Sequence, residues 1–80
     1  MAKFRKKPVV IEAERYVDRG RGLSTEFANA VHEDEEWVPW INTLEGRHRV
    51  SDGDFMIKGV KGEFYLCKPD IFEATYEAVV

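Results

Sequence analysis

The 80-residue sequence has a single cysteine, Cys67, and no long apolar segment. One cysteine cannot form a disulfide within the chain, and a lone thiol fits a reducing compartment. No stretch approaches the roughly 18 apolar residues that a membrane-spanning helix needs, and no secretory leader is recognisable. These absences predict a soluble cytoplasmic protein that contacts no membrane.

Motifs for catalysis and metal binding are also missing. No Cys-x-x-Cys or His-x-x-x-His spacing is present, and consecutive carboxylates such as those at 33–36 point in different directions. A lone cysteine on an apolar strand is usually a small core residue rather than a nucleophile. We therefore expect no metal, no cofactor and no catalytic residue, and we predict that the protein is not an enzyme.

The charges nearly balance but are unevenly placed along the chain. A net charge of −3, from 12 basic and 15 acidic residues, argues against general DNA binding. Residues 33–36 form an acidic run, and four basic residues crowd the N-terminus: Lys3, Arg5, Lys6 and Lys7. Either both segments are simply solvated, or the basic arm binds a phosphate-bearing partner, or the two oppositely charged segments meet across a self-association interface.

The length predicts a single domain over residues 1–80, in which residues 1–7 form a flexible basic arm. A domain of this size buries only about 60% of its unfolded surface and is marginally stable alone. Association is one way to gain further stability, so we expect a homo-oligomer.

The most informative stretch is a predicted β-hairpin in the last third of the chain. Two apolar runs, 55–58 and 63–67, flank a turn at 59–62 that contains two glycines. Pro69 has no N–H to give to a sheet and should end the second strand. Asp70 is then expected to cap one turn of helix, and residues 74–79 to form a last strand.

The N-terminal half predicts a strand and then a helix. Residues 9–16 alternate, with one face expected to be buried (Val9, Ile11, Ala13) and the other mostly exposed (Val10, Glu12, Glu14, Tyr16). Ser24 is typical of a helix cap, and Phe27, Ala30 and Val31 recur at helical spacing. The helix should therefore run for two to three turns and stop near His32.

The remaining segment predicts more sheet. The apolar run 37–42 contains Pro39, which favours an edge strand or an extended loop. Turns are expected at 43–46 and 51–54, on either side of a short strand. The predicted fold is therefore α+β, with a small, mostly antiparallel, curved sheet and one short helix packed on it.

Three segments resemble a known group of proteins: KFRKKPVVIEAERY, INTLEG and GDFMIKGVKGEFYLCKPDIFEATYE. They are similar to segments of a family of small uncharacterised phage and prophage proteins, in which the last segment reads like GDWIIKGVKGEFYPCKPDIFEATYE. This sequence departs from that pattern at Phe55, Met56 and Leu66, where Trp, Ile and Pro are expected. The resemblance implies a phage accessory protein in the host cytoplasm. Such proteins often block a host enzyme or sequester a host defence signal.

Candidate ligand-binding residues gather around the predicted hairpin. Lys58 and Lys61 share a turn with two glycines, whose N–H groups can face an anion, and Lys68 is expected beside them. Aromatic side chains suited to stacking on a base come from Trp37, Trp40 and Tyr65. Arg5 or Arg21 is expected from a neighbouring chain. Alternatively, the lysines only keep the turn soluble, and the tryptophans belong to the core or to a self-association surface.

These features lead to one hypothesis and two alternatives. We hypothesise a non-enzymatic phage accessory protein with a counter-defence role, which binds and sequesters an anionic, nucleotide-like host signal. The first alternative is a protein-binding inhibitor of a host enzyme, which would use the acidic run 33–36 and the strand edge around Pro39. The second alternative is a small virion or assembly component.

Overall fold

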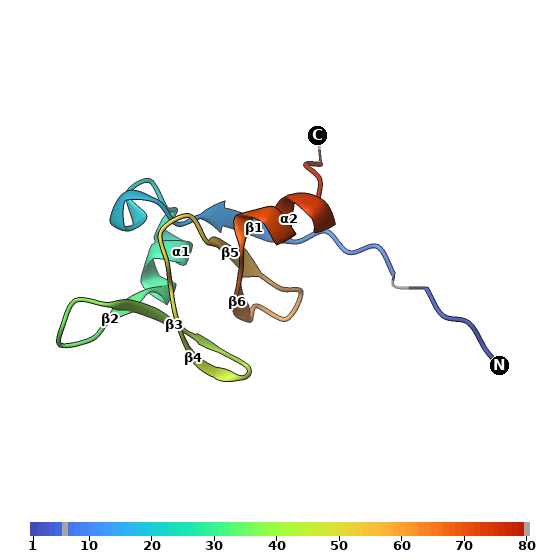
Figure 1. Cartoon of the computed structure of the whole chain (residues 1–80), viewed down its shortest axis with the longest axis horizontal. Coiled ribbons are helices and arrows are strands. Elements are labelled where there is room, and N and C mark those ends of the chain that lie inside the picture. Colours follow the sequence, from blue (N-terminus) through green and yellow to red (C-terminus); the bar gives the residue numbers. More distant parts are fainter. Residues whose placement is uncertain (6, 80) are drawn as a thin grey trace.

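The computed structural model describes residues 1–5 and 7–79, and it confirms the predicted α+β class (Figure 1). The chain forms two antiparallel three-stranded sheets, with orders β1-β5-β6 (sheet A) and β2-β3-β4 (sheet B). In chain order the elements are β1 Glu12–Arg15, a 3₁₀ turn Asp18–Gly20, α1 Thr25–Ala30, β2 His32–Glu33, β3 Pro39–Thr43, β4 Gly46–Arg49, β5 Phe55–Lys58, β6 Phe64–Cys67 and α2 Pro69–Thr75. Within the described ranges, neither helix has the length and apolar character needed to span a membrane.

Sheet A contains the predicted hairpin. In the β5–β6 pair, Lys58 lies opposite Phe64 and Phe55 lies opposite Cys67. The Gly59 N–H donates to the Glu63 carbonyl at 2.8 Å, which closes the turn. β6 ends before Pro69, as predicted, because that residue begins α2. β1 pairs with the other side of β5, so β5 is the central strand.

β1 is shorter than predicted, and its two faces were assigned wrongly. Val9 and Val10, expected inside the strand, precede it and are exposed. Tyr16, expected on the exposed face, is only 7% exposed and packs against Met56 in the core. Because both faces of sheet A are covered by other elements, the alternation of residue types along β1 does not mark which face meets water.

The main core lies between sheet A, α1 and sheet B. Its buried side chains come from five segments: Tyr16, Phe27, Ile41, Val50 and Met56. The Phe27 ring meets Phe64 of β6 edge to face, with centroids 5.3 Å apart. The predicted helix is confirmed, since the Ser24 hydroxyl accepts the Phe27 N–H at 3.4 Å as its N-cap. The helix ends at Ala30, slightly before the expected position, because the chain then enters β2.

The C-terminal segment is a second helix, not one helical turn and a strand. The Phe72 ring stacks on Phe55 with centroids 3.9 Å apart. Because Phe55 and Met56 point to opposite faces of β5, α2 covers the face of sheet A that α1 leaves open. Lys68 is the N-cap and Pro69 the first helical residue, so Asp70 is not the cap. Proline has its φ already set for that position, and the helix starts two residues earlier than predicted.

Sheet B corrects the prediction for Pro39. This residue begins β3, which is the central strand of the sheet rather than an edge. The missing N–H of proline is tolerated because Pro39 is the first residue of the strand, while its carbonyl accepts the Val50 N–H at 2.9 Å. Ile41 faces the core and is fully buried, so the opposite face of β3 is the outer face of the sheet.

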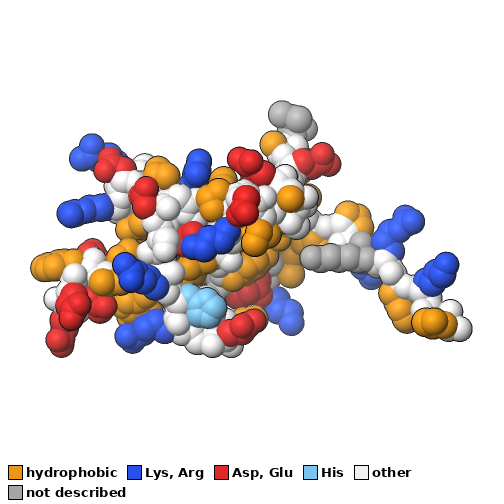
Figure 2. Space-filling model, in the orientation of Figure 1, with side chains coloured by type: hydrophobic (Ala, Val, Ile, Leu, Met, Phe, Trp, Pro, Cys, Tyr) orange, Lys and Arg blue, Asp and Glu red, His pale blue; other side chains and the backbone are white. Residues whose placement is uncertain are grey.

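Residues 1–5 and 7–10, here called the N-terminal arm, form no helix or strand and are exposed. Figures 1 and 2 show this arm running away from the body of the protein, with basic side chains along it. The predicted basic arm included Lys6, which lies outside the described residues. The described basic residues of the arm are Lys3, Arg5 and Lys7.

Candidate functional site

The structure does not bring together the three lysines that the sequence suggested for phosphate binding. Lys58 and Lys61 lie at the turn end of the hairpin, whereas Lys68 follows Cys67 at its other end, about 13 Å further along β6. The Lys58 ammonium forms an ion pair with Glu26 at 2.9 Å. That hydrogen bond is the main reason why the pKa of Lys58 is raised.

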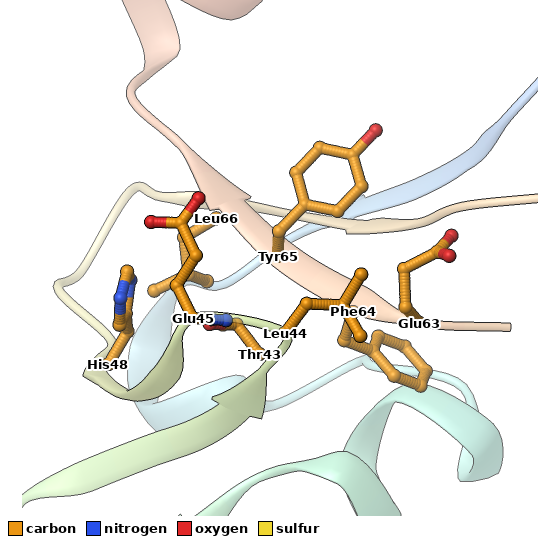
Figure 3. Close-up of a pocket in the computed structure, with 8 residues that line it drawn as sticks. All are labelled: Thr43, Leu44, Glu45, His48, Glu63, Phe64, Tyr65 and Leu66. Carbon is orange, nitrogen blue, oxygen red and sulfur yellow. The ribbon is translucent and has the colours of Figure 1, made fainter. Parts of the chain in front are cut away.

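Tyr65 lies in the middle of β6 and is half-buried. It helps to line a groove of about 420 Å³ between β6 and the turn that joins β3 to β4 (Figure 3). Its ring points to the opposite side of β6 from Phe64. Burial raises the pKa of Tyr65 to about 12, and a hydrogen bond to Tyr76 contributes to the rise. The Tyr65 hydroxyl therefore serves to fix the segment that follows α2.

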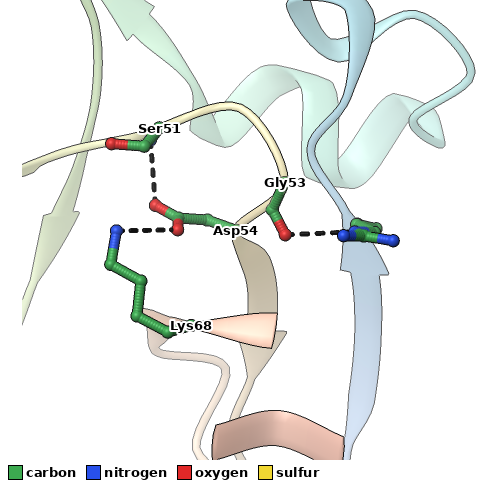
Figure 4. Close-up of polar contacts among 5 residues, drawn as sticks. Ser51, Gly53, Asp54 and Lys68 are labelled. Carbon is green, nitrogen blue, oxygen red and sulfur yellow. Dashed lines mark hydrogen bonds and ion pairs between the residues drawn. The ribbon is translucent and has the colours of Figure 1, made fainter. Parts of the chain in front are cut away.

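Lys68 is part of a structural network rather than an open cationic site (Figure 4). Its ammonium lies 3.1 Å from Oδ1 of Asp54, a residue that is only 3% exposed. The other oxygen of Asp54 accepts the Ser51 N–H at 2.9 Å. Nearby, Arg15 Nε donates to the Gly53 carbonyl at 3.1 Å. These contacts hold the 51–54 turn against β1 and the start of α2.

The two arginines proposed from the sequence lie away from the hairpin lysines. Arg5 belongs to the N-terminal arm and is exposed. Arg21 follows the 3₁₀ turn, and its guanidinium lies 3.7 Å from the Asp18 carboxylate in an exposed pair. The supply of either arginine by a neighbouring chain, as the sequence suggested, stays a prediction.

Trp40 is at the centre of a stack that the sequence did not reveal. The Arg47 guanidinium lies 3.7 Å from the centroid of the Trp40 ring, and the His32 ring stacks on Trp40 at 4.5 Å. His32 comes from β2 and Arg47 from β4, so both strands next to β3 contribute. Such a contact between an arginine and an aromatic ring fixes the guanidinium plane and contributes about 0.5–2 kcal/mol.

Arg49 extends this stack along β4. It lies directly opposite Trp40 in the β3–β4 register and on the same face of β4 as Arg47. His32, Trp40, Arg47 and Arg49 together form what we call the Arg–Trp patch, on the outer face of sheet B. In the part of the chain that the structure describes, neither arginine of this patch makes an ion pair. Among the described residues, no carboxylate therefore lies within ion-pair distance of either guanidinium.

A hollow of about 970 Å³ adjoins the patch at the end of sheet B where β3 begins. Arg49 lines it together with Arg19 and Trp37. The Trp37 side chain is 78% exposed and its backbone has a φ of +66°. Further lining residues carry polar groups: Tyr16, Glu33, Glu36, Ser51 and Asp52. The pKa of Tyr16 is raised, mainly by burial and then by the carboxylates of Glu33 and Asp52.

The sequence contains one pattern that indicates part of the arrangement around Trp37 and Trp40. The alternation in Arg47-His48-Arg49 places two arginines on one face of a strand. Which aromatic residue lies beside them depends on the pairing of β3 with β4, and no local pattern states that register. Arg19 and His32 come from separate segments and join the site only through tertiary packing.

The geometry around Cys67 and the histidines gives no support for nucleophilic or metal chemistry. Burial, with Asp70 and Asp54 nearby, raises the pKa of the Cys67 thiol and lowers its thiolate fraction at neutral pH. Among residues 1–5 and 7–79, no group of three or more His, Cys, Asp or Glu side chains is placed to hold a metal ion.

Comparison of the chain with protein-family models, with curated proteins and with solved structures returned no match. The Arg–Trp patch and the adjoining hollow together form the candidate functional site.

Proposed function

We propose that this protein is a non-enzymatic binding protein that captures a small anionic, nucleotide-like molecule on the Arg–Trp patch and in the hollow beside it. The observation that carries the proposal is the position of Arg47, 3.7 Å from the Trp40 ring, with Arg49 on the same face of β4. A guanidinium held against an aromatic ring keeps its N–H groups available for an oxyanion.

Arginine in this setting suits phosphate better than the lysines of the hairpin do. Its planar fork donates two parallel hydrogen bonds to a phosphate, and these charge-assisted bonds contribute about 1.5–3 kcal/mol each. Arg47 and Arg49 lie two residues apart on one strand, a spacing of roughly 7 Å between their backbones. Phosphate groups of one ligand can contact both.

The hollow supplies the other contacts that a nucleotide needs. Its volume of about 970 Å³ exceeds that of many small-molecule sites. The exposed Trp37 ring offers a stacking surface for a base. Carboxylates that line the hollow, such as Glu36 and Asp52, accept hydrogen bonds from sugar hydroxyls or base amino groups. Since carboxylates repel phosphate, the phosphate is assigned to the arginine side of the site.

The biological role within this proposal comes from the resemblance to phage proteins. A phage-encoded accessory protein that binds a nucleotide-like host signal in the host cytoplasm would lower the free concentration of that signal without chemistry. Sequestration of this kind requires affinity and abundance, and it does not require a catalytic residue. The proposal keeps Trp37 as a ligand contact, gives Trp40 the role of holding the Arg47 guanidinium, and replaces the hairpin lysines with Arg47 and Arg49.

The test is a titration of the protein with a panel of linear and cyclic nucleotides by isothermal calorimetry and intrinsic fluorescence. The chain has two tryptophans, and both belong to the proposed site, so binding should quench the emission directly. We expect Arg47→Ala and Arg49→Ala each to weaken binding by about tenfold or more, as the loss of one charge-assisted contact implies.

Arg21→Ala is the matched control, because Arg21 is an exposed arginine outside both the patch and the hollow. It should leave affinity unchanged. The proposal is wrong if no nucleotide of the panel gives heat or quenching at high micromolar concentration. It is also wrong if the patch variants bind as tightly as the Arg21 variant.

A second candidate function is favoured by the edge position of β4. This strand is the last in sheet B and all four of its residues are exposed, including Arg47, His48 and Arg49. An acidic segment of a host protein would bind the exposed arginines of this strand by charge complementarity. Capture of a host protein that depends on Arg47 and persists in saturating nucleotide would favour inhibition of a host enzyme over capture of a small molecule.

A further inference from the structure

We infer that the groove along β6 binds the N-terminal arm of a second copy of this chain. The groove lies on the side of β6 that faces away from β5. Three features indicate its occupant: the unpaired backbone groups of β6, the charge of the groove and the length of the arm. This inference concerns assembly and does not depend on the proposed ligand.

β6 is an edge strand of sheet A, and the groove separates it from the end of β3 and the β3–β4 turn. Sheet A has the order β1-β5-β6, so one side of β6 has no strand partner in that sheet. The Gly59 N–H donates to the Glu63 carbonyl, and antiparallel pairs alternate. The backbone groups of Phe64 and Leu66 therefore point away from β5, toward the open side.

The composition of β6 makes this edge a site for strand addition. Its four residues, Phe64–Cys67, include no charge and no proline. The other edges within the described residues carry charged side chains, as in β1 with Glu12, Glu14 and Arg15, or in β4 with Arg47 and Arg49. Proteins use charge or proline to block unwanted pairing at edges, so an apolar edge indicates a partner.

The groove complements the arm in both charge and apolar content. Leu44, Phe64 and Leu66 supply apolar lining to the groove, and Glu45 and Glu63 lie on either side (Figure 3). The arm carries Lys3, Arg5 and Lys7 around Phe4, whose side chain is 94% exposed. The Phe4 ring can contact the apolar lining of the groove, while the basic side chains of the arm lie near Glu45 and Glu63. The arm then matches the groove in both apolar content and charge.

The geometry favours an arm from a second copy over the chain's own arm. β1 pairs with β5 on the side opposite β6, so β5 and β6 lie between the start of the chain's own arm and the groove. Figure 1 shows that arm directed away from the body. About ten extended residues reach roughly 33 Å, which is enough to cross to a neighbour. In a two-fold dimer, each copy gives one arm and one groove.

The experiment measures the mass of the full-length protein and its charge-reversed variants by native mass spectrometry and by light scattering during gel filtration. The arm variant is Lys3→Glu/Arg5→Glu, and the groove variant is Glu45→Lys. We expect a dimer for the unmodified chain. Each variant alone should raise the dimer dissociation constant by about tenfold or more, because both arm–groove contacts become repulsive.

The decisive experiment mixes the arm variant with the groove variant. In a mixed dimer one contact is native and the other has both charges exchanged, so both contacts are attractive again. We therefore expect the mixed dimer to dominate over either variant's own dimer. Glu35→Lys is the matched control, since it makes the same charge change at an exposed residue outside the groove, and it should dimerise normally.

A further variant, Phe4→Ser, removes the apolar anchor from an exposed residue without touching the folded body, and it should also weaken the dimer. The inference is overturned if the full chain is a monomer at high micromolar concentration. An arm that docks on the groove of its own chain would give that result. It is equally overturned if dimers form but none of the three variants weakens them.

Discussion

The Lys68 ammonium lies 3.1 Å from Oδ1 of Asp54, and the two side chains differ greatly in exposure, 60% for Lys68 and 4% for Asp54. The buried carboxylate has a hydrogen-bond donor on each oxygen, Lys68 on one and the Ser51 N–H on the other. The pair thus ties the start of α2 to the turn before β5, and it explains why Lys68 is a structural residue.

We predict that Lys68→Met lowers the free energy of unfolding by about 1–3 kcal/mol, because Asp54 keeps its charge while losing one donor. Urea denaturation followed by circular dichroism measures the change. Lys61→Met is the matched control, since Lys61 is exposed in the hairpin turn and makes no ion pair in the described part of the chain. Equal stability of the two variants would contradict the structural role of Lys68.

A second prediction concerns two glycines that both have positive φ, Gly20 at +82° and Gly22 at +90°. Alanine at either position costs about 1 kcal/mol from backbone strain. A Cβ on Gly20 would also lie 3.0 Å from the Tyr16 ring and 3.2 Å from Leu23, whereas a Cβ on Gly22 meets nothing within 4 Å.

We therefore expect Gly20→Ala to destabilise the protein by roughly 1 kcal/mol more than Gly22→Ala, since it also crowds the core. Thermal and urea unfolding of both variants give the comparison. A larger loss of stability in Gly22→Ala than in Gly20→Ala would contradict the packing of the 3₁₀ turn against Tyr16.

A third prediction tests how α2 is attached to sheet A. Phe72 stacks on Phe55 at 3.9 Å and also lies 5.0 Å from Tyr76. Phe72→Ala should cost about 2 kcal/mol, less than a fully buried phenylalanine because Phe72 is half-buried. Hydrogen exchange within residues 69–75 should accelerate in this variant. Ile71→Ala, at an exposed neighbour, should change stability by no more than about 0.5 kcal/mol and leave that exchange slow.

The fourth prediction concerns the alkaline limit of stability. Burial raises the pKa of Tyr65 from 10.0 to about 12, so the folded state holds this proton more tightly than the unfolded chain does. The resulting stabilisation is fully present below pH 10 and is lost as the pH rises toward 12. The free energy of unfolding should therefore fall less steeply between pH 10 and 12 in Tyr65→Phe than in the unmodified protein.

Urea denaturation at a series of alkaline pH values measures this difference in slope. The comparison between the two proteins isolates Tyr65, because Tyr16 and Cys67, whose pKa values are also raised, titrate in both. Parallel curves would show that the environment of the Tyr65 hydroxyl is wrongly described.

Local patterns in the sequence were sufficient for the hairpin and for α1. The hairpin follows from two apolar runs around a turn with glycines, and the register is short enough for the turn to set it. Ser24 and the spacing of Phe27, Ala30 and Val31 likewise determine a helix start and its buried side. Each of these predictions depends on residues close together in the chain, so neighbouring side chains and backbone geometry decide the outcome.

Contacts between distant segments decided everything else. The sequence could not show that α2 covers the second face of sheet A, and it treated residues 74–79 as a strand. It also misplaced Tyr16, whose burial depends on α1 and sheet B packing against the other face. Nor could it show that Lys68 lies beside Asp54 or that Arg47 lies on Trp40. Long side chains bind whichever partners the fold brings within a few ångströms, so the chemistry of a lysine or arginine is fixed by strand pairing and helix docking, not by its neighbours in sequence.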